Sequence, residues 1–80
     1  MEINEILKGM NEIFIDVLDN EEIQLTAETT AADIEEWDSL SHIMLIVAIE
    51  KKYQIKFTSM EIAGFKNVGE LCNTIQNKVN

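Results

Sequence analysis

Residues 38–53 read DSLSHIMLIVAIEKKY, and the helix boundaries in this stretch are the clearest in the chain. It opens with Asp38 and Ser39, short polar side chains that can accept hydrogen bonds from the first free amides of a helix. An apolar run follows and ends in lysines and a tyrosine at residues 51–53. The sequence therefore predicts a helix that begins at residues 38–39 and ends at residue 52 or 53.

This helix carries two apolar faces. At about 100° per residue, one face holds Leu45, Ile46, Ile49 and Tyr53, and the opposite face holds Leu40, Met44 and Val47. Because a small bundle buries one face of a helix, we expect the first set in the core and the second on the surface. An exposed apolar strip usually marks contact with a partner. The alternative is a central helix that is buried all round.

Three further helices are expected. Apolar residues recur at steps of three and four over residues 2–18 and again over residues 67–79. Thr58 or Ser59 can cap a short helix that Gly64 stops, and residues 53–57 form an extended connector because no partner strand exists for them. The predicted fold is all-α, a four-helix bundle of three longer helices plus one short helix, in one domain over residues 1–80. The core should contain Ile13, Phe14, Ile46, Ile49 and Leu71.

A long loop is expected between the first two helices, over residues 19–38. It is rich in acids, and its large apolar residues are Ile23, Leu25, Ile34 and Trp37. Thr30 and Asp33 have capping-box spacing, so a short helical turn is predicted over residues 31–36. Loops of this length in small domains usually serve a function.

The charge is unevenly placed along the chain. The formal net charge is -9, and residues 9–50 contain eleven acids and no lysine or arginine, whereas five lysines follow from Lys51 onward. Such a field repels nucleic acid and anionic membrane and attracts basic protein surfaces, although acidity can also serve solubility alone. A chain of 80 residues has room for one modest core, which disfavours an enzyme with a deep, dry pocket.

Location and redox state follow from what the sequence lacks. Residues 1–5 show neither the basic start nor the apolar run of a secretory signal, and no apolar stretch is long enough to span a bilayer. We therefore expect a cytoplasmic protein without membrane insertion. Cys72 is the single cysteine, which excludes an intramolecular disulfide and a multi-cysteine zinc site and suggests a small core residue.

Asp38-Ser39-Leu40, at the start of a helix after a long acidic loop, resembles the Asp-Ser-Leu phosphopantetheine attachment motif of acyl carrier proteins. The resemblance covers essentially the whole chain, with Phe57 and Val68 at places where that family tends to be apolar. It implies that Ser39 receives 4'-phosphopantetheine from coenzyme A through a separate transferase, which makes the chain a phosphoprotein. The thiol of the arm then bears an acyl group as a thioester, and the chain itself catalyses nothing.

The resemblance also implies partners and a pathway class. The expected partners are a phosphopantetheinyl transferase, an acyl- or aminoacyl-loading ligase, and condensing or acyl-transfer enzymes, which would meet a monomer. The pathway would be fatty-acid, polyketide or specialised lipid biosynthesis, with aminoacyl or D-alanyl carriage as the alternative. The residues expected to contact partners are Glu36, Asp38, Leu40, Met44 and Val47. The best-known fatty-acid carriers often have glycine and a small residue in place of Glu36 and Trp37, and often expose acids in place of Met44 and Val47.

Other interpretations of the same residues remain. One is that Ser39 is a capping hydroxyl in an unmodified module that binds a partner helix through the apolar strip. His42, three residues later, invites a serine hydrolase interpretation. We disfavour it because no group is evident that would fix the imidazole or form an oxyanion hole, and because the helical wheel turns His42 toward the core. Trp37 is expected to anchor the loop, with contact to the arm as the alternative, and no metal-ligand spacing is present.

Overall fold

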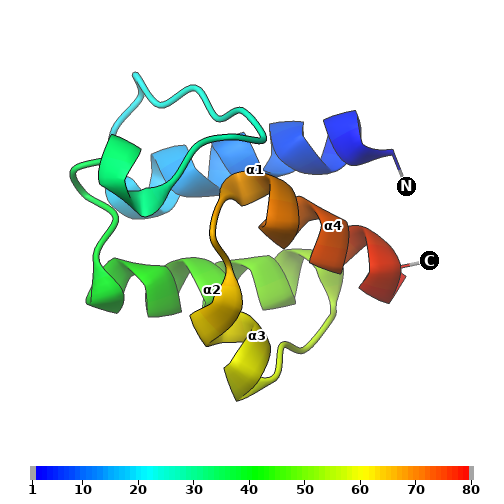
Figure 1. Ribbon diagram of the computed structural model, residues 1–80. Helices are drawn as coiled ribbons and strands as arrows, with labels where there is room; N and C mark the ends of the chain where they lie inside the picture. The colour runs from blue at the N-terminus through cyan, green and yellow to red at the C-terminus, as the bar shows by residue number, and fades with distance from the viewer. Residues whose placement is uncertain (1, 80) are drawn as a thin grey trace.

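The computed structural model describes residues 2–79 and is all-helical over that range. Its elements are α1 (Ile3–Leu18), the 3-10 turn η1 (Ala31–Asp33), α2 (Ser39–Tyr53), α3 (Ser59–Gly64) and α4 (Val68–Val79). Figure 1 shows α1 and α2 running in opposite directions, with α4 beside α1 and the short α3 crossing near α2. The predicted four-helix fold with three longer helices and one short helix is confirmed.

Capping at both ends explains the bounds of α2. Asp38 Oδ1 accepts from the Ser41 amide at 2.9 Å, and the Asp38 amide donates to Ser41 Oγ at 2.8 Å. The helix ends where Gln54 adopts the left-handed conformation (φ 55°) and its amide bonds to the carbonyl of Glu50. The predicted start and end of this helix are therefore confirmed.

The short elements also begin at the predicted caps. Thr58 and Glu61 form a reciprocal box at the start of α3, with distances of 2.8 and 3.1 Å. The Thr30 amide donates to Asp33 Oδ2 at 2.9 Å and opens η1, which is shorter than the expected turn. The end of α3 at Gly64 is confirmed. The described residues include no glycine with positive φ, and α3 stops because Phe65 is extended (φ -72°, ψ 120°).

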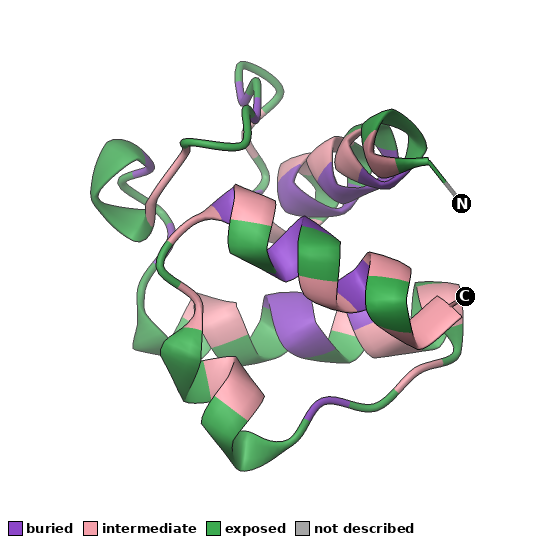
Figure 2. Ribbon diagram, turned by 45° about the vertical axis from the view of Figure 1, so that its right-hand side comes forward, coloured by how far each residue is buried: buried purple, intermediate pink, exposed green. Residues whose placement is uncertain are grey.

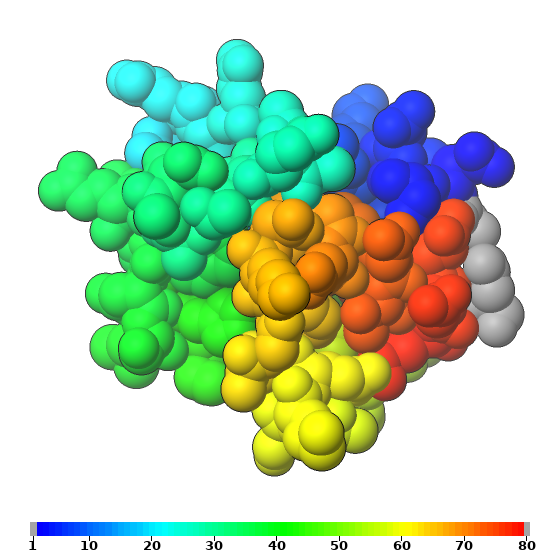
Figure 3. Space-filling view, viewed as in Figure 1, coloured from blue at the N-terminus to red at the C-terminus, as the bar shows by residue number. Residues whose placement is uncertain are grey.

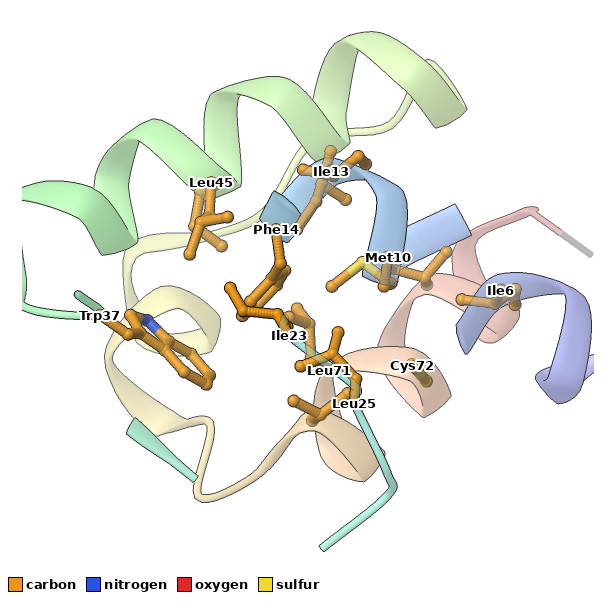
Figure 4. Close-up of a cluster of buried hydrophobic side chains, with 14 of the residues drawn as sticks. Ile6, Met10, Ile13, Phe14, Ile23, Leu25, Trp37, Leu45, Leu71 and Cys72 are labelled. Carbon is orange, nitrogen blue, oxygen red and sulfur yellow. The ribbon is translucent and has the colours of Figure 1, made fainter. Parts of the chain in front are cut away.

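The core lies between α1, α2 and α4 and includes all five residues predicted for it. Figure 2 shows the buried stripes of these helices facing one another, and Figure 4 shows the side chains of Phe14, Met10, Leu71 and Leu45 meeting there. On α2 the exposed fractions of Leu45, Ile46 and Ile49 are 1%, 3% and 0%. The opposite face is exposed, so the interpretation of α2 as buried all round is wrong.

The segment between α1 and α2 is held to the bundle by its own apolar residues and by backbone hydrogen bonds. Ile23, Leu25, Ile34 and Trp37 are buried. The side chain of Asn11 on α1 donates to the Ile23 carbonyl at 3.2 Å and accepts from the Leu25 amide at 2.7 Å. The first amides of α4, those of Val68 and Gly69, donate to the carbonyls of Thr29 and Ala27, each at 2.8 Å. These bonds give the segment a defined path up to Ser39.

Within residues 2–79, no helix combines the length and the apolar character needed to cross a bilayer.

Candidate functional site

Ser39 is the first residue of α2, and its side chain is exposed. Its hydroxyl has no hydrogen-bond partner within residues 2–79, because Asp38 and Ser41 share the capping role. The amide and then the hydroxyl of Ser41 hold the pKa of the Asp38 carboxyl below its usual range, so this carboxylate stays anionic. Ser39 therefore presents a free hydroxyl, and the interpretation of Ser39 as the helix cap does not match the geometry.

The start of α2 suits a phosphodiester on Ser39. The first amides of a helix lack intrahelical partners and carry the positive end of the helix dipole. The Asp38 carboxylate takes the amide of Ser41 and also interacts with that of Leu40, which leaves the amide of Ser39 without a protein partner in the described chain. A phosphate ester on the Ser39 oxygen would lie beside this donor. The residues present thus fit a phosphopantetheine group, with Ser39 as its point of attachment.

A groove of about 450 Å³ opens beside Ser39. Residues 37–39 and His42 line one side, residues 62, 63, 65 and 66 line the other, and Ala31 of η1 lies at the rim. In Figure 3 the surface of the first turns of α2 (green) adjoins that of α3 and the residues after it (yellow to gold). The lining is mostly apolar, with Asp38 and Lys66 as its charged residues. This groove leads from the Ser39 hydroxyl to the wall formed by α3.

Trp37 closes the inner side of the groove. Its indole is buried, packs edge to face on Phe14 with ring centroids 5.0 Å apart, and points into the core in Figure 4. The indole N–H donates to His42 Nδ1 at 3.0 Å, and the two rings are stacked with centroids 5.9 Å apart. Trp37 therefore anchors the loop, as expected. Because Trp37 also lines the groove, contact with an arm stays the alternative role for this side chain.

His42 does not form a catalytic pair with Ser39. While Nδ1 accepts from Trp37, Nε2 lies 2.9 Å from the carbonyl oxygen of Ile62 in α3. Both ring nitrogens are thus engaged, and neither is bonded to the serine hydroxyl. A general base must reach the proton that it removes, so this arrangement offers no activated nucleophile.

The exposed apolar strip on α2 extends further than the sequence analysis indicated. The exposed fractions of Leu40, Met44 and Val47 are 73%, 49% and 44%, and Ile43 joins them at 50%. The helical wheel already placed Ile43 on this face, so the signal was available. Met60 of α3, 86% exposed, was also missed, and a helix as short as α3 has no periodicity from which to predict it.

The two acids expected at the rim of this strip, Glu36 and Asp38, are both exposed. Glu36 Oε2 accepts from the side-chain amide of Asn20 at 3.2 Å, and Asp38 caps α2. The structure thus brings both carboxylates to the Ser39 end of α2, while the strip continues along the helix.

Cys72 lies in the core, 1% exposed, on α4. Burial raises the pKa of its thiol to about 11, because the thiolate would be poorly solvated there. The expectation of a small core residue is confirmed. Within residues 2–79, no three residues of the His, Cys, Asp and Glu types are grouped to hold a metal ion.

Comparison with known proteins agrees with this site. Residues 10–75 match the family model described as the phosphopantetheine attachment site, which defines the chain as a phosphopantetheine-binding carrier domain. A solution NMR structure of a holo acyl carrier protein from Geobacter metallireducens superposes with a TM-score of 0.87 and 46% identity, covering 92% of this chain and 85% of that one.

Curated relatives point the same way. The meromycolate extension acyl carrier protein of Mycobacterium leprae is 35% identical over 72 residues, which are 90% of this chain and 63% of that protein. The acyl carrier protein of Clostridium perfringens is 33% identical over 66 residues, which are 82% of this chain and 87% of that protein. The chain belongs to the acyl carrier protein family, whose prosthetic group is 4'-phosphopantetheine. The resemblance seen in the sequence is confirmed.

Proposed function

We propose that this chain carries acyl groups as thioesters on a 4'-phosphopantetheine arm attached to Ser39, within a single carrier domain over residues 1–80. The observation that carries the proposal is the free, exposed hydroxyl of Ser39 at the positive end of α2. A separate transferase would move the group from coenzyme A to this oxygen. When attached, the group supplies the thiol on which the acyl thioester forms.

The chain's own residues hold and present the arm, and we propose that they catalyse no reaction. The amide of Ser39 and the positive end of the α2 dipole would stabilise the phosphate, and Trp37 would exclude water from the inner wall of the groove. His42 has no nitrogen free to activate a nucleophile. These features support a carrier over a hydrolase.

Partner enzymes would dock on the exposed face of α2. The apolar strip of Leu40, Met44 and Val47 offers the buried centre of such a contact, and Glu36 and Asp38 offer an anionic rim. Enzymes with a basic edge around an apolar groove match this surface: the transferase, a loading ligase, and condensing or acyl-transfer enzymes. With a net charge of -9, we propose that neither nucleic acid nor an anionic membrane is a partner.

For the pathway we propose fatty-acid, polyketide or specialised lipid biosynthesis. Support comes from the mycobacterial relatives, which are named for meromycolate extension. The alternative is aminoacyl or D-alanyl carriage, because the arm, rather than the folded chain, bears the cargo. Loading assays with acyl and aminoacyl ligases would separate these two classes.

Mass spectrometry after incubation with coenzyme A and a broad-specificity transferase tests the attachment site. We expect one added phosphopantetheine, which disappears in Ser39→Ala. Ser59→Ala is a matched control, because Ser59 is also an exposed first residue of a helix and should leave modification intact. A wild-type chain that several transferases leave unmodified would contradict the proposal. Hydrolysis of an activated ester that depends on His42 would support the hydrolase instead.

A thiol reagent gives a second readout. Cys72 is buried and its pKa is about 11, so the folded, unmodified protein should react slowly near neutral pH. Modified protein should gain one fast-reacting thiol, that of the arm. Equal fast reaction of unmodified and modified protein would count against attachment.

A further inference from the structure

The hydrogen bonds of His42 fix its protonation state. The indole N–H of Trp37 is a donor only, so Nδ1, 3.0 Å away, must accept with a lone pair. The carbonyl oxygen of Ile62 is an acceptor only, so Nε2, 2.9 Å away, must bear the hydrogen. Both bonds exist together only for the neutral imidazole with its proton on Nε2.

This imidazole joins three parts of the fold. Trp37 belongs to the loop, His42 lies one turn after Ser39 on α2, and Ile62 belongs to α3. The same three residues and Ser39 line the groove beside the attachment point. His42 therefore determines how the wall formed by α3 sits relative to the serine.

The helix α3 has few other attachments. It has six residues, none of them buried, and a helix of that length is not stable without tertiary contacts. Its other contacts are the ion pair of Glu61 with Lys78 at 3.1 Å and the packing of the half-buried Ile62 against the core. Just after the helix, Phe65 packs edge to face on Phe57, with centroids 5.6 Å apart. Within residues 2–79, the bond from His42 is the side-chain hydrogen bond that joins α3 to α2.

We propose that His42 is a positioning residue: through its bonds to the Trp37 indole and to the Ile62 carbonyl, it holds α3 beside the start of α2 as the outer wall of the groove. The inference rests on the proposed function for its effect on the arm, but the contact itself exists without the arm.

The charged groups around His42 are few. Asp38 and Lys66 line the same groove. Glu61, next to Ile62, accepts a hydrogen bond from the Thr58 amide and forms an ion pair with Lys78. Glu70 at the start of α4 accepts a hydrogen bond from the Lys66 amide. Asp38 and Glu61 are thus engaged by the caps of their own helices, and His42 is bonded to Trp37 and Ile62 rather than to a charged group.

NMR and amide hydrogen exchange on the unmodified protein test the proposal. The chain has one tryptophan and one histidine, so the indole N–H and the imidazole signals are unambiguous. The imidazole nitrogen shifts should show the hydrogen on Nε2 and a lone pair on Nδ1. Removing the two bonds of His42 should accelerate amide hydrogen exchange in α3 about five- to tenfold, as expected for the loss of one hydrogen bond.

Two variants separate positioning from simple packing. His42→Gln can still accept one hydrogen bond and donate another, so exchange in α3 should remain as slow as in wild type. His42→Phe retains a ring but neither hydrogen bond, so exchange in α3 should be about five- to tenfold faster than in wild type. The proposal is overturned if His42→Phe protects α3 as well as wild type does, or if His42→Gln exchanges as fast as His42→Phe. Ser39→Ala, which cannot carry an arm, should show the same exchange in α3 as wild type, so a failure of the attachment proposal would be detected independently of this one.

Discussion

Two glycines on either side of the α3–α4 turn should respond in opposite ways to alanine. A Cβ added at Gly69 would lie 2.9 Å from the carbonyl oxygen of Ala27 and 3.2 Å from its Cβ. Because the nearest atom belongs to the backbone, the loop would have to move. A Cβ added at Gly64 meets nothing within 4 Å, and no glycine among the described residues has a positive φ.

The expected magnitudes follow from the bonds at stake. Moving the loop weakens the hydrogen bonds from Val68 to Thr29 and from Gly69 to Ala27, both 2.8 Å long. Two such bonds contribute about 1 to 3 kcal/mol to the free energy of unfolding. Replacing glycine by alanine within a helix adds up to about 1 kcal/mol, because alanine has the higher helix propensity. We therefore expect Gly69→Ala to lower the free energy of unfolding by about 1 kcal/mol. Gly64→Ala should raise it by about 0.5 to 1 kcal/mol, because it gains propensity without a clash.

Urea melts followed by circular dichroism at one pH measure both variants against wild type. The free energies of unfolding of the two variants should differ by about 2 kcal/mol. In thermal melts of a domain of this size, the same difference is a separation of roughly 8 to 16 °C in Tm. Equal shifts of the same sign would show that the contact between the loop and α4 does not constrain Gly69. The position assigned to the loop, against the start of α4, would then be wrong.

The remaining predictions concern the core, the docking surface and pH. In urea melts, Ile49→Ala should lower the free energy of unfolding by about 2 to 5 kcal/mol, because Ile49 is fully buried. Ser39→Ala should lower it by about 1 kcal/mol or less, because Asp38 caps α2. Equally mild effects of the two substitutions would contradict this assignment. Replacing Met44 and Val47 by glutamate should weaken binding to the cognate enzyme and improve recognition by fatty-acid ketosynthases. Dissociation constants at two salt concentrations would measure both effects. An unchanged affinity for the cognate enzyme would show that the apolar strip is not part of the contact. Because burial raises the pKa of Cys72 from 9.0 to about 11, its thiol contributes stability that is complete below about pH 9 and is lost as pH rises toward 11. Stability should thus fall less over that range in Cys72→Ala than in wild type, and parallel curves would argue against the shift. The cytoplasmic location stays a prediction, which cell fractionation would check.

Much of the helical architecture could be predicted because its signals are local. Caps act within three residues, so Asp38, Thr58 and Thr30 were recognisable where they stand. Apolar residues at steps of three and four share a helix face, so the buried and exposed sides of α2 were readable as well. The motif at residues 38–40 is also local, and with the helix order it led to the family.

Helix ends were less accessible to sequence reasoning. Asp19 and Gln54 take left-handed conformations that are more often assigned to glycine, with φ of 53° and 55°. Gly64, where α3 ends, does not adopt this conformation. These choices depend on how the following segment must run to pack, which a local pattern does not encode.

Four helices, a two-faced α2 and a serine at its start could be read from the amino-acid sequence, because each depends on neighbours within one or two helical turns. The free Ser39 hydroxyl, the groove that leads from it to α3, and the bonds of His42 to Trp37 and Ile62 are seen only in the folded chain. The Ile62 carbonyl is 20 residues away from His42 along the chain. Contacts at such separations depend on how the whole core packs, and on the distance and orientation of two backbones that no periodicity in the sequence specifies.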